Sequence, residues 1–169
     1  KIEILLIPIM LPMFVYFIFS VIPKIDPKKK LNNMGKKLQT LKFLVTSLMS
    51  ALALFIIYSS QNKTAANPTF IFVFVGILYV VLGNYFKTIK ANYFIGIRTP
   101  WTLESESIWK ETHLLAGKLW LSGGLLIVIS SLFLDEKFNV VLFLIITGII
   151  TIIPAIYSFL LFKRESKIG

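Results

Sequence analysis

Residues 83–120, GNYFKTIKANYFIGIRTPWTLESESIWKETHLLAGKLW, lie between two long apolar runs. They hold the only histidine of the chain, His113, and all three of its tryptophans. They also hold Arg98, one of two arginines, and three of the eight acidic residues. A charged and aromatic segment between two stretches of hydrocarbon is typical of a chain at a membrane surface. This placement limits every functional interpretation.

The composition outside this segment is that of a membrane protein. The chain is 56% apolar and only 15% charged, with a mean hydropathy of +0.80. Several runs exceed the roughly 18 apolar residues that a transmembrane helix needs. The sequence therefore predicts an all-α fold, a polytopic transmembrane helix bundle that forms one domain over residues 1–169. The absence of cysteine excludes disulfides and thiolate metal sites.

Five spans are expected in this chain. The predicted ranges are 4–22, 41–58, 69–86, 119–134 and 138–162. The fourth is expected to continue a helix that begins well upstream of it. Apart from Lys42, at the edge of the second range, none of the five ranges holds a charged residue or a histidine. Ion-coupled transporters and intramembrane hydrolases need ionisable groups at depth, so both classes are disfavoured.

The basic residues predict how the chain is oriented. Of the 18 lysines and arginines, 15 fall in residues 23–42, 87–118 and the C-terminal tail. The connections on the opposite side hold only Lys1, Lys63 and Lys137. By the positive-inside rule the three basic regions are cytoplasmic, and the chain as given starts outside. We therefore expect an N-terminal truncation, with six spans in the full protein.

The Lys28-Lys29-Lys30 run belongs to the first basic region. We interpret it mainly as a determinant of topology. Each lysine there could also add roughly 1 kcal/mol of attraction to anionic lipid, which makes the loop a plausible docking site for an acidic partner.

The centre of the 83–120 segment carries the signal for a helix start. Thr99 and Thr102 can cap a helix whose first residue is Pro100. The charge of Glu104 and Glu106 suits the first turns of such a helix. We expect a short amphipathic helix that passes directly into the fourth span. Residues 92–98 are too short to span and too apolar for a solvated loop, so we expect them to fold back as a re-entrant or interfacial segment.

Several side chains of this segment have a structural and a functional interpretation. The tryptophans are typical of an aromatic belt at the lipid headgroups. Arg98 either fixes the loop or forms part of a binding signature. His113 is interpreted as a polar helix residue at the membrane interface more readily than as a ligand or a base. A metal site from Glu104, Glu106, Glu111 and His113 has no known ligand spacing, so we expect no metal and no cofactor.

A long motif also runs through the segment. It comprises Gly83-Asn84, then Lys90-x-Asn92-x-Phe94-x-Gly96-Ile97-Arg98-Thr99-Pro100-Trp101-Thr102-Leu103, then Trp109, His113 and Gly117-Lys118. It resembles the SdpI family, bacterial membrane proteins whose best-known member gives immunity to a secreted killing peptide. The resemblance is close over 83–120 and rests on hydropathy and spacing elsewhere.

The resemblance implies a location and partners. It implies a multi-pass protein of the bacterial plasma membrane, surrounded by lipid, that meets a secreted peptide toxin at its outer face through 61–68, 135–139 and the segment before Lys1. At its inner face it implies capture of a small winged-helix repressor, with no direct contact to nucleic acid and no catalysis. The signature or partner-binding residues so implied are Asn84, Lys90, Asn92, Phe94, Gly96, Arg98, Thr99, Pro100, Trp101, Trp109 and His113.

The sequence is also compatible with two other functions. One is a membrane enzyme or lipid-modifying protein that uses His113 with Glu106 or Glu111. The other is a subunit of a larger membrane complex, held through small-residue faces on spans 41–58 and 138–162.

Overall fold

The computed structural model describes residues 2–27, 31, 34–61 and 69–166. Over these residues the chain is helical and contains no strand. The helices are α1 (Ile2–Ile25), α2 (Lys36–Gln61), α3 (Thr69–Phe86), α4 (Pro100–Glu104), α5 (Glu106–Phe133) and α6 (Glu136–Glu165). All but α4 are long and apolar enough to cross a membrane. The all-α class and the five expected spans are therefore confirmed.

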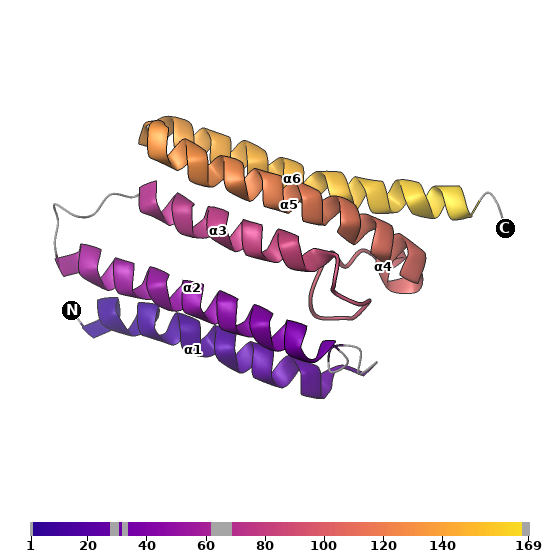
Figure 1. Cartoon of the computed structure of the whole chain (residues 1–169), viewed down its shortest axis with the longest axis horizontal. Helices are drawn as coiled ribbons and strands as arrows, with labels where there is room; N and C mark the ends of the chain where they lie inside the picture. The colour runs from indigo at the N-terminus through magenta and orange to yellow at the C-terminus, as the bar shows by residue number, and fades with distance from the viewer. Residues whose placement is uncertain (1, 28–30, 32–33, 62–68, 167–169) are drawn as a thin grey trace.

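The long helices run antiparallel to their neighbours in sequence (Figure 1). The α1–α2 hairpin lies on one side of α3, and α5 and α6 lie on the other. The most extensive helix contact is between α3 and α5. One end of the bundle, called here the α4 end, gathers α4 with the ends of α1, α3 and α6 and the starts of α2 and α5. The segment between α3 and α4 folds back at this end.

The surface of the bundle is apolar, and much of its interior is small or polar. Phe133, for example, is 81% exposed, whereas Ser131 and Ser158 are buried. In lipid, helices gain nothing from burying hydrocarbon against each other, so small residues that permit close approach mark the contacts. The pattern is that expected of a multi-pass membrane protein.

The α3–α5 contact shows this close approach at two levels. A Cβ on Gly83 would lie 2.5 Å from the backbone nitrogen of Leu121 and 2.9 Å from the Gly117 carbonyl oxygen. The second level involves Gly76, seven residues before Gly83 in α3, and Gly124, seven residues after Gly117 in α5. A Cβ on Gly124 would lie 2.6 Å from the carbonyl oxygen of Gly76. Because these neighbours are backbone atoms, only glycine permits this helix separation.

A proline in α6 explains one contact between α5 and α6. Pro154 has no N–H, so the carbonyl of Ile150 lacks its usual partner within the helix. Trp120 of α5 donates its indole N–H to that carbonyl oxygen at 2.9 Å. The aromatic-belt interpretation is therefore wrong for Trp120, whose N–H serves a neighbouring helix.

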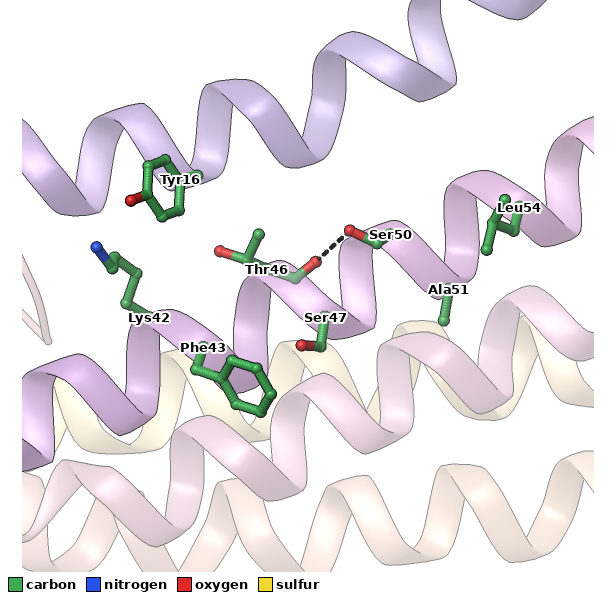
Figure 2. A pocket seen from close by; sticks show the side chains of 8 residues that line it. All are labelled: Tyr16, Lys42, Phe43, Thr46, Ser47, Ser50, Ala51 and Leu54. Atoms are coloured by element: carbon green, nitrogen blue, oxygen red, sulfur yellow. Dashed lines mark hydrogen bonds between the residues drawn. The ribbon is translucent and has the colours of Figure 1, made fainter.

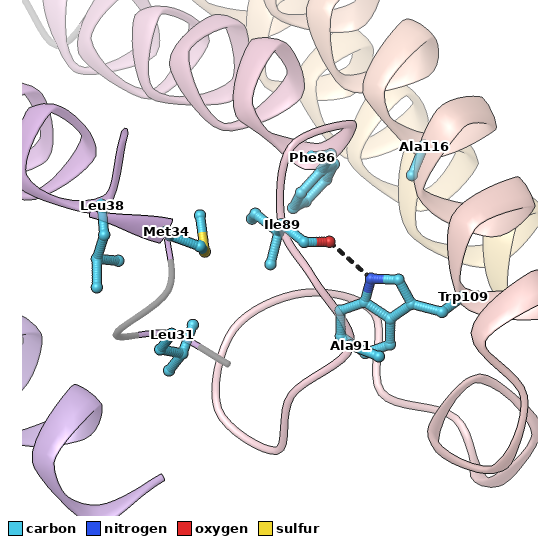
Figure 3. Close-up of a cluster of buried hydrophobic side chains, with 8 residues drawn as sticks. All are labelled: Leu31, Met34, Leu38, Phe86, Ile89, Ala91, Trp109 and Ala116. Atoms are coloured by element: carbon cyan, nitrogen blue, oxygen red, sulfur yellow. Dashed lines mark hydrogen bonds between the residues drawn. The ribbon is translucent and has the colours of Figure 1, made fainter. Parts of the chain in front are cut away.

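The α4 end has its own buried apolar cluster, which joins the α1–α2 hairpin to the rest of the bundle (Figure 3). Leu31, Met34 and Leu38 approach it from one side, and Ile89 and Trp109 from the other. The cluster thereby fixes the folded-back segment against both halves of the molecule.

The predicted span 69–86 has the same bounds as α3, whereas α1, α2 and α6 extend beyond their predicted ranges at both ends. The largest of these differences is at the start of α2, where a polar first turn carries no hydropathy signal. The fourth span does continue a helix that begins well upstream, at Glu106, as expected. One helix passing from Thr99 into the fourth span was a wrong prediction. Ser105 breaks it, with extended backbone and a side chain that accepts a hydrogen bond from the N–H of Ile108 at 3.3 Å. The Lys28-Lys29-Lys30 run and residues 62–68 lie outside the described residues.

Candidate functional site: the loop between α3 and α4

The segment between α3 and α4, called here the 87–99 loop, is organised around Asn92. This side chain is 1% exposed. Its Nδ2 donates to the carbonyl oxygens of Lys90 (2.8 Å) and Ile95 (3.0 Å). Its Oδ1 accepts from the N–H groups of Phe94 (2.8 Å) and Ile95 (2.7 Å). One buried amide thus satisfies four backbone groups of a turn, a role that suits asparagine.

Two α5 side chains one turn apart hold the loop from beneath. Trp109 donates its indole N–H to the carbonyl oxygen of Ile89 at 2.8 Å (Figure 3). His113 accepts from the N–H of Ile97 through Nε2 at 3.0 Å. The two rings stack, with centroids 4.0 Å apart and an interplanar angle of 16°. The folded-back position expected for residues 92–98 is therefore confirmed.

The hydrogen bonds of His113 also define its tautomer. Because Nε2 accepts from Ile97, the ring proton is on Nδ1, which lies 2.8 Å from the Trp109 carbonyl oxygen and donates to it. The ring is 1% exposed, so both nitrogens serve the fold. His113 is a buried structural residue rather than the interfacial polar residue that was expected.

Glycine is required at position 96 for two reasons. Its φ is +115°, in the region that residues with a side chain rarely adopt. A Cβ there would also collide with Nε2 of His113 and lie 3.2 Å from the Trp109 ring. The glycine of the motif is thus explained by the close approach of the loop to these two rings.

The Thr99-Pro100-Trp101-Thr102 start of α4 folds as the sequence predicts. The Thr99 hydroxyl accepts from the N–H of Thr102 at 3.3 Å, and the Thr102 hydroxyl accepts from the N–H of Thr99 at 2.9 Å. This reciprocal pair is a capping box with proline at the first helical position. The hydroxyl of Thr102, which is 0% exposed, also donates to the Ile97 carbonyl oxygen at 2.9 Å.

The α4 helix is docked on the C-terminal part of α6. The Thr99 and Ser158 hydroxyls lie 3.0 Å apart and share a hydrogen bond. Trp101 packs edge-on against Phe159 and Phe162, at centroid distances of 5.3 and 6.2 Å. Trp101 is half-buried between helices, so its ring contributes to tertiary packing.

A second link between these elements had not been anticipated from the sequence. Ser105 and Ser107, at the junction of α4 and α5, both donate to the carboxylate of Glu165 near the end of α6. The serine before Glu106 was a signal for the helix break, since Ser is a preferred N-cap residue. No comparable sequence signal pointed to Glu165.

The remaining motif residues lie on the loop or on the helix ends next to it. Lys90, Arg98 and Pro100 are exposed, and Phe94 is half-buried against the cluster at the α4 end. The guanidinium of Arg98 donates to the carbonyl oxygen of Tyr93 at 2.6 Å, which supports the loop-fixing interpretation. Asn84 is exposed on the last turn of α3.

The site offers little for catalysis by His113. Both ring nitrogens are engaged by the backbone, while Glu106 and Glu111 are exposed on α5. Over the part of the chain that the structure describes, no group of three His, Cys, Asp or Glu side chains is placed to hold a metal ion.

A cavity of about 500 Å³ lies between α1 and α2 (Figure 2). Lys42 reaches across it, with Nζ 4.2 Å from the centroid of the Tyr16 ring and 3.5 Å from the Ser20 hydroxyl. The small residues Ser47 and Ala51, predicted to pack against another helix, are exposed beside this cavity. Their face of α2 has no helix on it within the described chain.

Comparison with known protein families matches the part of the chain that begins in the 87–99 loop. Residues 88–158 match the SdpI/YfhL protein family. The chain is also 30% identical over 90 residues to the Immunity protein SdpI of Bacillus subtilis (strain 168), an alignment that covers 53% of this chain and 43% of that relative. The chain thus spans less than half the length of this relative. No solved structure matches the chain. The family match takes in most of the 87–99 loop together with α4, α5 and most of α6, so this part of the chain is similar to the SdpI/YfhL protein family.

Proposed function

We propose that this protein is a non-catalytic immunity protein of the bacterial plasma membrane that protects its cell from a secreted peptide toxin. The similarity to an immunity protein and the five membrane-crossing helices support this function. The hydrogen bonding of His113 is the observation that supports a function without catalysis. Both ring nitrogens form hydrogen bonds with backbone groups. The imidazole of His113, the side chain of the motif best suited to acid–base chemistry, therefore holds the loop in position.

The immunity function is tested by a protection assay. The full-length gene is expressed in a strain that is sensitive to a secreted peptide toxin, and survival is measured against added toxin. Protection by the wild-type protein is expected. Survival equal to that of the empty vector, with the protein present in the membrane, contradicts the proposal.

We further propose that the α4 end faces the cytoplasm, with residues 23–42, 87–118 and the C-terminus inside. The basic residues of these regions support this orientation by the positive-inside rule. The chain has no cysteine, so single cysteines can report topology without a background. Glu104 and Lys137 are exposed at opposite ends of the bundle and are suitable positions, whereas Thr102 is buried.

A membrane-impermeant maleimide added to intact cells should label Lys137→Cys and leave Glu104→Cys unlabelled until the cells are opened. Labelling of Glu104→Cys in intact cells would show that the α4 end faces the outside of the cell and would contradict the proposed orientation.

On the inner face, we propose that the outward side of the 87–99 loop captures a small winged-helix repressor. Arg98 and Lys90 are exposed on a loop whose backbone is fixed from within, which lowers the entropic cost of recognition. The variant Arg98→Gln should lose co-purification of a winged-helix repressor that is produced in the same cells, while remaining at normal abundance. The variant Arg164→Gln removes a positive charge from α6 and serves as the control. Equal capture by both variants would count against this surface.

A further inference from the structure

We propose that a cavity at the α4 end is a binding site for the phosphate group of an anionic phospholipid headgroup. The cavity has a volume of about 600 Å³. Four lysines from three different elements line it: Lys37 from α2, Lys87 and Lys90 from the 87–99 loop, and Lys110 from α5. This site shares Lys90 with the surface proposed for the repressor, but lipid binding does not depend on the toxin or on the repressor.

The charge of the cavity favours an anion. Among the charged residues that line the cavity, four are lysines and only one, Glu106, is acidic. All four lysines are exposed, so their side chains can converge on a ligand. Between them the wall is apolar, formed in part by Phe86, Ile89 and Trp109. A basic rim beside an apolar wall suits a molecule with a phosphate and a hydrocarbon part.

The cavity also lies at the depth of the headgroups. The 18 residues of α3 extend about 27 Å, close to the roughly 30 Å thickness of a hydrocarbon core. Lys87 follows the last residue of α3 directly, and Lys90 follows three residues later. Positive side chains at this position meet lipid phosphates, and a lysine near an anionic surface contributes favourably to binding.

The site is held in place before a ligand arrives. The N–H of Thr88 donates to the carbonyl oxygen of Tyr85 at 2.8 Å, which ends α3 with a turn. The Ile89 carbonyl oxygen accepts from the Trp109 indole N–H, and that of Lys90 accepts from Asn92. The backbone beneath Lys87 and Lys90 is thus fixed on both sides, so binding orders only the lysine side chains.

The test uses the purified chain in detergent, stripped of lipid, and native mass spectrometry to measure binding. The probes are phosphatidylglycerol, phosphatidylcholine and inorganic phosphate. The wild-type protein should retain phosphatidylglycerol more tightly than phosphatidylcholine, and inorganic phosphate should not displace it. Removal of each lysine should weaken phosphatidylglycerol binding by about fivefold.

Two variants locate the effect. The site variant carries Lys37→Gln, Lys87→Gln, Lys90→Gln and Lys110→Gln. The control variant removes four charges elsewhere, through Lys24→Gln, Lys118→Gln, Lys163→Gln and Arg164→Gln, all at exposed positions. The site variant should lose phosphatidylglycerol binding, and the control variant should bind as the wild type does.

Three results would overturn the proposal: equal losses in the two variants, equal retention of the two lipids, or displacement of the lipid by inorganic phosphate. If the site variant does not fold, as judged by circular dichroism, the double variant Lys87→Gln/Lys110→Gln replaces it. Its control is the double variant Lys118→Gln/Lys163→Gln, and lipid binding by the two double variants is compared in the same way.

Discussion

Trp120 donates its indole N–H to the carbonyl oxygen of Ile150, the acceptor that Pro154 leaves without a helical partner. The donor is on α5 and the acceptor on α6, and the indole ring also packs against Tyr79 of α3, at a centroid distance of 4.9 Å. One tryptophan therefore connects three helices and satisfies a backbone group that lies away from water. In a hydrocarbon environment such a group is costly to leave unpaired.

Replacing Trp120 by phenylalanine should lower the free energy of unfolding in detergent by about 1–3 kcal/mol, because the Ile150 carbonyl loses its donor. Pro154→Ala restores an N–H in α6 that can bond this carbonyl. The loss caused by Trp120→Phe should therefore be smaller in the Pro154→Ala background, measured by thermal unfolding as a double-mutant cycle. The half-buried Trp101 gives the control Trp101→Phe, which retains an edge-on ring contact. Additive effects of Trp120→Phe and Pro154→Ala would contradict the role of this hydrogen bond.

The variant Gly96→Ala should destabilise the protein by about 1–3 kcal/mol, because alanine is strained at a φ of +115°. Its Cβ would also displace His113 and so weaken the hydrogen bond to Ile97. The measurement is the melting temperature, together with the accessibility of the loop to protease. Gly148→Ala is the matched control, since a Cβ there meets nothing within 4 Å. Because Gly148 lies inside α6, this change should stabilise by about 0.5–1 kcal/mol. If Gly96→Ala left the stability unchanged, the close approach of the loop to His113 and Trp109 would not explain why this residue is glycine.

The variant His113→Ala leaves the N–H of Ile97 and the carbonyl of Trp109 without their side-chain partner. The expected cost is about 1–3 kcal/mol in the free energy of unfolding. His113→Gln retains a hydrogen-bond acceptor and should lose less. Abundance and protection from the toxin should fall together across the two variants. Loss of function in both variants at full stability would instead indicate a chemical role for the imidazole.

Hydropathy predicted the number of spans because each apolar run is long enough on its own. Span 69–86 was bounded correctly at both ends, because polar residues follow it at Lys87 and precede it near Asn67. The start of α2 was missed by several residues, because its first turn holds lysines, which fit a helix that emerges from the membrane but have no hydropathy signal. The upstream extension of the fourth span was expected, but the break at Ser105 that separates α4 from α5 was not.

Local hydrogen bonding was also predictable at α4. A Thr-Pro pair with a second threonine three residues on specifies a capped helix start without any tertiary information. The role of Trp109 and Trp120 was not predictable in this way, because tryptophan is equally typical of a lipid interface and of a buried N–H donor. Only the partners, Ile89 in the loop and Ile150 beside a proline, distinguish the two roles.

The α3–α5 pairing depends on tertiary contact, yet the sequence does carry a trace of it. Gly76 and Gly83 are seven residues apart in α3, and Gly117 and Gly124 are seven apart in α5. This spacing places each pair on one face of its helix, the arrangement that lets backbones approach closely in membranes.

Neighbouring glycines on α5 test this packing directly. A Cβ on Gly124 would lie 2.6 Å from the Gly76 carbonyl oxygen and 2.7 Å from the Val80 nitrogen, and backbone atoms cannot rotate away. A Cβ on Gly123 would meet the side-chain methyls of Ile146 and Ile150 at 2.8 and 3.0 Å, which can adjust. Gly124→Ala should therefore destabilise by about 1–3 kcal/mol, as overpacking does, and Gly123→Ala by clearly less. Both are measured by thermal unfolding in the same detergent. If Gly123→Ala proved the more damaging of the two, the tightest packing of α5 would be against α6, and the glycine pairs would not determine the distance between α3 and α5.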